Sequence, residues 1–382
     1  MIRDLAAATP EMLAIFDDAA LLRAALDFET ALAEAQAAEG LIPAAQATLI
    51  ATACTAPPID LAALASAASH AGTLAIPLLA QLRALVPDQD AARQIHRGAT
   101  SQDLADTALI LQAKAAATLI EREADRIARA LAALAETHLA TPLTGRTLLQ
   151  AALPVSFGLK AAQWLLGIDE AAARFRTERQ GALVLQFGGA AGTLAGLDGR
   201  AFAVAERLAA TLGLACPPVP WHARRNGIAG LGTALAILCG AAAKIARDIA
   251  LLAQSEIAEA FEPRIEGRGG SSAMAHKRNP TGCQIILSAA LRTPGLAATL
   301  LAALPQEHER GLGGWQAEAP VLAELFQLTH GALAALAAIA EGLEIDPARM
   351  QANLDQAGIG ADLGESVALA RRALAHYRKA AQ

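Results

Sequence analysis

Apolar residues recur every three or four positions over long stretches of this chain, which is the spacing of amphipathic helices. The clearest stretch, 101–140, runs about forty residues without Gly or Pro. Four more stretches of this kind follow at roughly 154–180, 227–262, 280–304 and 316–342. Five helices of comparable length predict a helix bundle at the centre of the fold.

Shorter elements are predicted on both sides of this bundle. Residues 11–95 are expected to form several short helices, because Gly and Pro interrupt the pattern. These interruptions are Gly40, Pro43, Pro57-Pro58, Pro77 and Pro87. Two modest helices follow Asp346-Pro347 near the end of the chain. We therefore predict an N-terminal helical domain (1–95), a central helical-bundle domain (96–342) and a short C-terminal helical domain (343–382).

The composition agrees with an all-α fold. Hydrophobic residues make up 54% of the 382 residues and aromatic residues only 3%, while alanine is abundant throughout. Alanine is the best helix former, and its small side chain lets helices approach closely. The formal net charge is −6 and no basic stripe recurs along the sequence, so nucleic-acid binding is not expected.

The apolar stretches do not predict a membrane protein. The most apolar run, 228–243, is shorter than the roughly twenty residues that a membrane-spanning helix needs. Asp4 and Pro10 interrupt any secretory pattern at the N-terminus, so we expect a cytoplasmic protein. The four cysteines have no paired metal spacing and are interpreted as buried free thiols rather than disulfides. They are Cys54, Cys216, Cys239 and Cys283.

Candidate chemistry is densest in 267–280, GRGGSSAMAHKRNP, which we call the third segment. Ser271 and Ser272 offer adjacent hydroxyls, and His276 and Lys277 offer positive charge beside them. Glycines at its start tolerate backbone angles that other residues resist. Hydroxyls backed by cations suit proton transfer on a substrate rich in carboxylates. The alternative is an ordinary solvated surface loop.

A first segment, HRGATSQD at 96–103, lies where a loop enters the first long helix. Hydroxyls and free backbone N–H groups at a helix N-terminus make a natural carboxylate site. Thr100 and Ser101 supply the hydroxyls, and Ser101 is the expected N-cap. His96 and Arg97 add positive charge immediately before them. Capping by Ser101 does not exclude contact with a substrate.

These segments resemble conserved blocks of the fumarase/aspartase superfamily. The third segment is similar to its signature loop GSSxMPxKxNP, although Ala275 stands where the family normally has Pro. The first segment and a second segment, GRTLLQAALPVSFGLK at 145–160, resemble the other two blocks in the expected order. The resemblance implies an all-α, central five-helix bundle that forms a twenty-helix core in a homotetramer. It also implies active sites built from three subunits, and a third domain larger than the one present here.

The resemblance also assigns roles to residues. Ser271 or Ser272 would carry the proton, with Lys277 as the third catalytic residue. The implied substrate-binding residues are His96, Arg97, Thr100, Ser101, Gln102, Thr147, Gln150, His276, Asn279 and Arg310. A surface role for Arg310 is equally compatible with the sequence. No metal ion and no cofactor is implied.

The second segment departs from many members of the superfamily at one position. Leu148 stands where they carry a His, in a pattern like T-H-x-Q, that assists the leaving group. A carboxylate is already ionised at neutral pH and needs no such help to act as a nucleophile. The loss of the imidazole therefore favours intramolecular attack by a carboxylate, which forms a lactone. The alternative is that another histidine, such as His96 or His222, takes the role.

Two further stretches, 220–232 and 306–318, are similar to the lactonising branch of the superfamily, the 3-carboxy-cis,cis-muconate cycloisomerases. Asn226 and Gly227 depart from that branch's pattern. Trp221 and Trp315 are more plausible as packing residues than as ligands. The expected substrate is a small tricarboxylate. A fumarate-releasing lyase, such as adenylosuccinate lyase, and a non-catalytic relative remain the alternatives.

Overall fold

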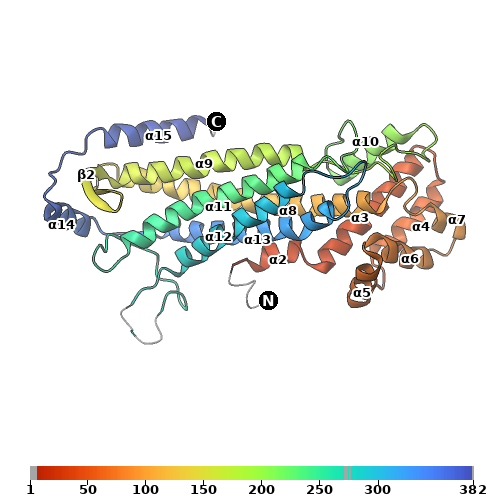
Figure 1. The fold of residues 1–382 in the computed structure, drawn as a ribbon, viewed down its shortest axis with the longest axis horizontal. Coiled ribbons are helices and arrows are strands. Elements are labelled where there is room, and N and C mark those ends of the chain that lie inside the picture. Colours follow the sequence, from red (N-terminus) through yellow and green to blue (C-terminus); the bar gives the residue numbers. More distant parts are fainter. Residues whose placement is uncertain (1–6, 271–273, 275–276, 381–382) are drawn as a thin grey trace.

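Five long helices pack side by side in the computed structural model, which describes residues 7–270, 274 and 277–380 (Figure 1). They are α8 (Ser101–Thr137), α9 (Phe157–Ala182), α11 (Asn226–Leu252), α12 (Thr281–Ala302) and α13 (Gly314–Glu341). The predicted all-α fold with a central helix bundle is confirmed. All five follow from helical periodicity, because each buries one apolar stripe against its neighbours.

Small residues let the bundle helices approach closely. A Cβ atom on Gly232 of α11 would lie 2.2 Å from a methyl carbon of Leu300 on α12. One continuous core runs between the helices, and it includes Ile120 and Ile127 of α8, both fully buried. The Ala- and Gly-rich composition is therefore a packing requirement of this bundle.

A second apolar core lies at one end of the bundle, shown on the right of Figure 1. Within the described residues, six shorter helices build it, and one of them comes from much later in the sequence. They are α3 (Asp18–Ala38), α4 (Ala44–Thr55), α5 (Leu61–Ala71), α6 (Ala75–Leu85), α7 (Gln89–Gln94) and α10 (Ala201–Leu212). A further short helix, α2 (Pro10–Ile15), packs on the core of the bundle instead. The expected break at Pro77 is wrong. Pro77 lies in the first turn of α6, where its missing N–H has no helical partner to lose.

Two short antiparallel sheets lie at the opposite end of the bundle. A hairpin pairs β1 (Pro142–Thr147) with β2 (Gln150–Ser156), and β3 (Ala260–Phe261) pairs with β4 (Glu344–Ile345). The sequence did not predict these strands. The helix expected over 227–262 ends at Leu252. Beyond it the chain turns and brings the buried Glu259 to Arg146, where two N–O distances of 2.8 Å join the guanidinium to the carboxylate.

The C-terminal part consists of α14 (Pro347–Ala357) and α15 (Ser366–Ala380). Helix α15 lies along α9 and buries Ala370 and Leu374 (Figure 1). The proposed domain boundaries at 95 and 342 stay a prediction. Three of the four cysteines are buried free thiols as expected, whereas Cys216 is exposed.

Candidate active site

The three segments are divided between the two ends of the bundle. Helix α8 begins inside the first segment and has 37 residues, so at about 1.5 Å per residue it is roughly 55 Å long. The hairpin of the second segment follows the far end of α8, at the end of the bundle that also carries β3 and the described residues of the third segment (Figure 1). One copy of the chain therefore keeps the first segment far from the second segment and from the described part of the third.

Thr100, rather than Ser101, is the N-cap of α8. The Thr100 N–H donates to a carboxylate oxygen of Asp103 at 2.9 Å, and the Asp103 N–H donates to the Thr100 carbonyl at 2.9 Å. The predicted N-cap was wrong by one position. The acidic side chain three residues after Thr100 accepts a hydrogen bond from the Thr100 N–H, and this makes Thr100 the N-cap. Ser101 consequently lies in the first helical turn, partly exposed.

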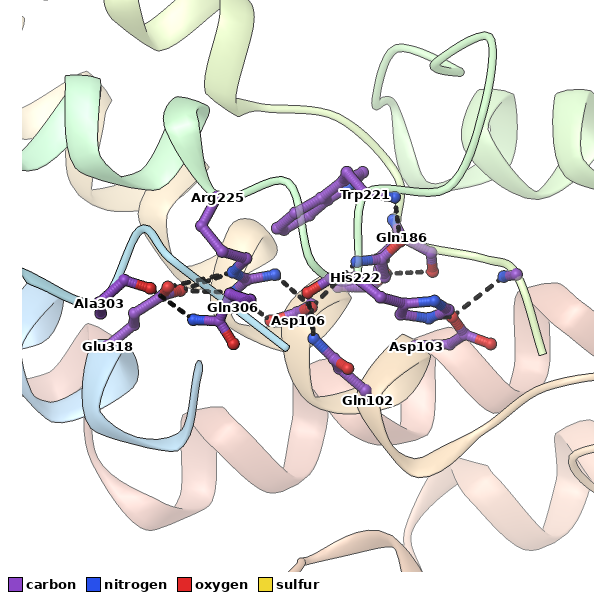
Figure 2. Close-up of polar contacts among 12 residues, drawn as sticks. Gln102, Asp103, Asp106, Gln186, Trp221, His222, Arg225, Ala303, Gln306 and Glu318 are labelled. Carbon is purple, nitrogen blue, oxygen red and sulfur yellow. Dashed lines mark hydrogen bonds and ion pairs between the residues drawn. The ribbon is translucent and has the colours of Figure 1, made fainter. Parts of the chain in front are cut away.

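The Asp103 carboxylate also binds a glycine-rich loop and a histidine (Figure 2). The backbone N–H groups of Gly188 and Gly189 donate to it at 3.0 and 2.9 Å, and His222 Nε2 lies 2.6 Å from Oδ1. Asp103 is fully buried. Four donors around one buried carboxylate fix the start of α8 against the chain at 188–189.

Next to this carboxylate lies a buried ion cluster centred on Arg225 (Figure 2). The guanidinium donates to both oxygens of Asp106 at 2.8 Å and to Glu318, and it stacks 4.5 Å from the Trp221 ring centre. Arg225 and Glu318 are each 1% exposed. Burial raises the pKa of Glu318 above its usual value, although Arg225 opposes that shift. The cluster ties α8, α11 and α13 together beneath the first segment.

The other predicted residues of the first segment are held by protein groups. His96 Nδ1 lies 2.6 Å from a carboxylate oxygen of buried Glu29, and the backbone of His96 is left-handed (φ 67°). Arg97 donates to the Leu41 carbonyl and pairs with Asp198, each at 2.9 Å. Substrate contacts by His96 and Arg97 stay predictions.

Gln102 and Arg310 also have protein partners at this end. Gln102 is fully buried and donates to Asp106 at 3.1 Å. Arg310 donates to the Ala190 carbonyl at 2.9 Å and to the Gly189 carbonyl at 3.3 Å. The structure thus brings Arg310 to the same loop that Asp103 holds. Its proposed contact with substrate stays a prediction.

The second segment presents its polar residues on a strained turn. Thr147 and Gln150 pair across the hairpin, and Leu148 and Leu149 connect them with left-handed φ angles of 50° and 66°. This conformation costs about 1–2 kcal/mol for each residue that carries a Cβ. Leu148 is 97% exposed and Leu149 is 74% exposed. The turn thus holds two leucines outward beside the predicted binding residues Thr147 and Gln150.

The third segment is described only in part, and Ser271, Ser272 and His276 lie outside the described residues. Lys277 is exposed, at the lining of a cavity of about 160 Å³. The Asn279 side chain donates to the Gly270 carbonyl at 3.2 Å. Phe261 of β3 lines the same cavity as Lys277 and Asn279, so both residues lie at the end of the bundle that also carries the second segment.

Comparisons with known proteins agree with this architecture. A family model described as a lyase matches residues 4–295. The chain belongs to the fumarase/aspartase superfamily of lyases. It is 51% identical to a 3-carboxy-cis,cis-muconate cycloisomerase of Bradyrhizobium diazoefficiens, over 94% of this chain and 80% of that protein. It is 44% identical to a nitrosuccinate lyase of Streptomyces davaonensis, over 95% of this chain and 78% of that protein.

A solved structure supports the same family. The crystal structure of the 3-carboxy-cis,cis-muconate lactonizing enzyme from Pseudomonas putida is 37% identical, with a TM-score of 0.92. The alignment covers 99% of each chain. At this similarity the correspondence extends over the bundle, the hairpin and the terminal helices.

The sequence did not reveal the buried ion cluster. Asp106, Arg225 and Glu318 are separated by more than ninety positions in sequence, and only the fold brings them together. One signal was present, because Asp103 and Asp106 interrupt an otherwise apolar stripe of α8 one turn apart. Charged residues in such a stripe are rarely buried unless they are paired.

Proposed function

We propose that the protein converts 3-carboxy-cis,cis-muconate to 4-carboxymuconolactone, a step in the breakdown of protocatechuate. The observation that carries the proposal is the exposed turn at Leu148. The resemblance to the superfamily implies an imidazole at this position in many of its lyases. A lactonising reaction does not need that imidazole, because the attacking carboxylate is already charged at neutral pH. The similarity of nearly the whole chain to enzymes named for this reaction supports the same function.

The proposed reaction is an intramolecular addition. A carboxylate oxygen forms a bond to one carbon of a double bond, and the double-bond electrons move to the neighbouring carbon. That carbon lies next to another carboxylate, which takes up the charge as an aci-carboxylate until the carbon receives a proton. Ser271 or Ser272 would deliver the proton, and Lys277 would stabilise the developing charge. Thr100, Ser101, Thr147, Gln150 and Asn279 would bind the other carboxylates.

The same proposal includes a homotetramer with shared sites. Segments at opposite ends of one bundle come together only if other copies of the chain pack against it in the antiparallel direction. Within the part of the chain that the structure describes, three helices (α11, α12 and α13) are long and apolar enough to cross a membrane, and the most apolar window of α12 is only 28% buried within one copy. Partner copies would cover that surface in a twenty-helix core. If partner copies cover these helices, the protein needs no membrane, and a cytoplasmic location stays a prediction.

An eliminating lyase is the second candidate, because a relative 44% identical to the chain is named for that type of reaction. The two functions are distinguished by assaying the purified protein with 3-carboxymuconate, adenylosuccinate, argininosuccinate and nitrosuccinate. Lactonisation shortens the conjugated system, so we expect the ultraviolet absorbance of 3-carboxymuconate to fall. Release of fumarate from a saturated substrate, with no turnover of 3-carboxymuconate, would replace the proposal with an elimination.

A further inference from the structure

A cavity of about 520 Å³ lies between the hairpin and the helices α9 and α11, outside the residues assigned above except Thr147. One part of its wall is apolar and comes from Leu153, Leu159 and Ile245. The other part carries the cations Arg146, Lys160 and Lys244. Ligand cavities have volumes of about 300–1,000 Å³. A lining that combines apolar side chains with cations suits a small unsaturated carbon chain that bears carboxylates.

Two of these three cations already have carboxylate partners. Arg146 binds both oxygens of Glu259 at 2.8 Å, and Lys244 binds both oxygens of Asp248 at 2.6 and 2.7 Å. Lys160 is partly buried, and its ammonium has no hydrogen bond or ion pair within the described parts of the chain. One cation in the cavity therefore has no direct partner, and it interacts with the carboxylates of Asp248 and Glu259 only at longer range.

The position of Lys160 is unfavourable in the empty protein. It lies in the first turn of α9, where the helix dipole disfavours a cation. Burial lowers the pKa of Lys160 from its usual value, and the neighbouring Lys244 and Arg146 lower it further, while Asp248 opposes them. An unpaired cation that is held at a stability cost is typical of a binding residue.

We propose that this cavity is an anion-binding site in which the Lys160 ammonium binds a carboxylate of a small unsaturated polycarboxylate. Thr147 lies at the same cavity and carries a hydroxyl for a second hydrogen bond. That this ligand is the substrate of the enzyme rests on the proposed function. Lys160 would then anchor a carboxylate that does not react, next to the hairpin that carries Leu148.

The test uses Lys160→Met, which keeps the length of the side chain and removes its charge. Without ligand, the variant should have a higher melting temperature than the wild type, because an unpaired charge has been removed. Propane-1,2,3-tricarboxylate, a saturated and unreactive probe, should raise the melting temperature of the wild type but not of the variant. Lys160→Arg should retain part of this response.

Lys379→Met is the control, since it removes an exposed lysine on α15 that does not line the cavity. We expect it to keep the response to the tricarboxylate. With 3-carboxymuconate, Lys160→Met should raise KM about 10- to 100-fold with little change in kcat, as for loss of a hydrogen bond to a charged group. Lys379→Met should change KM by no more than about twofold, as for an exposed charge.

Two results would overturn the proposal. In one, Lys160→Met responds to the tricarboxylate as the wild type does. In the other, Lys160→Met lowers the melting temperature and dissociates the oligomer in light scattering, which means that Lys160 pairs with a partner subunit. The wild type could bind the tricarboxylate through Lys160 and still fail to turn over 3-carboxymuconate. That result would support the anion-binding site and contradict only the proposed function.

Discussion

At the scale of single residues, Asp103 holds the first segment in place. Its buried carboxylate accepts hydrogen bonds from the backbone of Thr100, Gly188 and Gly189 and contacts His222. The substitution Asp103→Asn keeps the shape of the side chain but removes its charge. It also places an NH₂ group, which is itself a donor, among the groups that donate to Asp103. We expect the free energy of unfolding to fall by about 2–4 kcal/mol, because the buried donors lose their charged acceptor.

Urea unfolding at one fixed protein concentration measures this loss, since the stability of an oligomer depends on concentration. Asp125→Asn is the control, because it is the same substitution on the same helix in an exposed pair with Arg176. That variant should lose less than about 1 kcal/mol. Equal losses in the two variants would contradict a special role for Asp103.

At the scale of elements, the hairpin turn combines strain with exposed apolar side chains. Leu148→Gly and Leu149→Gly each relieve one left-handed residue, so either variant should gain about 1 kcal/mol of stability. The resemblance to the superfamily places only Leu148, and not Leu149, at the position of the imidazole. We therefore expect Leu148→Gly to lower kcat/KM for 3-carboxymuconate, and Leu149→Gly to leave it nearly unchanged.

Thermal melting and steady-state kinetics on the two variants separate these effects. If both glycine variants kept full activity, Leu148 would have no part in the site. If both lost activity equally, the turn as a whole would matter rather than the side chain at 148. The comparison is informative because both leucines extend into solvent within one copy of the chain.

The two kinds of element also differ in how far the sequence predicts them. The five long helices follow from periodicity, because helical contacts are local and repeat over many turns. The hairpin was missed, since strands of six and seven residues give too little periodicity to detect. The buried pairing of Asp106 with Arg225 could not be predicted either, because it joins positions 119 apart. The sequence identified the three segments from their residues. It did not predict that the length of α8 separates the first segment from the second and from the described part of the third.

At the scale of the whole molecule, that separation predicts complementation between inactive variants. One variant is Ser271→Ala with Ser272→Ala, which removes the proposed proton carrier. The other is Thr100→Val with Ser101→Ala, which removes the hydroxyls of the first segment. Each alone should be several orders of magnitude less active than the wild type. If sites combine segments from different copies, some sites in a mixed tetramer contain no altered segment.

The two purified variants are mixed in equal amounts, unfolded in urea and refolded together. Random assembly should restore about a quarter of wild-type activity, because each of two segments has an even chance of coming from the unaltered source. Each variant refolded alone is the control, and light scattering should report a tetramer in every sample. Recovery would fail if a single copy supplied all three segments, because every chain then carries one altered segment into its own site. A monomer with full activity would contradict shared sites directly, since the roughly 55 Å length of α8 would then have to be bridged within one chain.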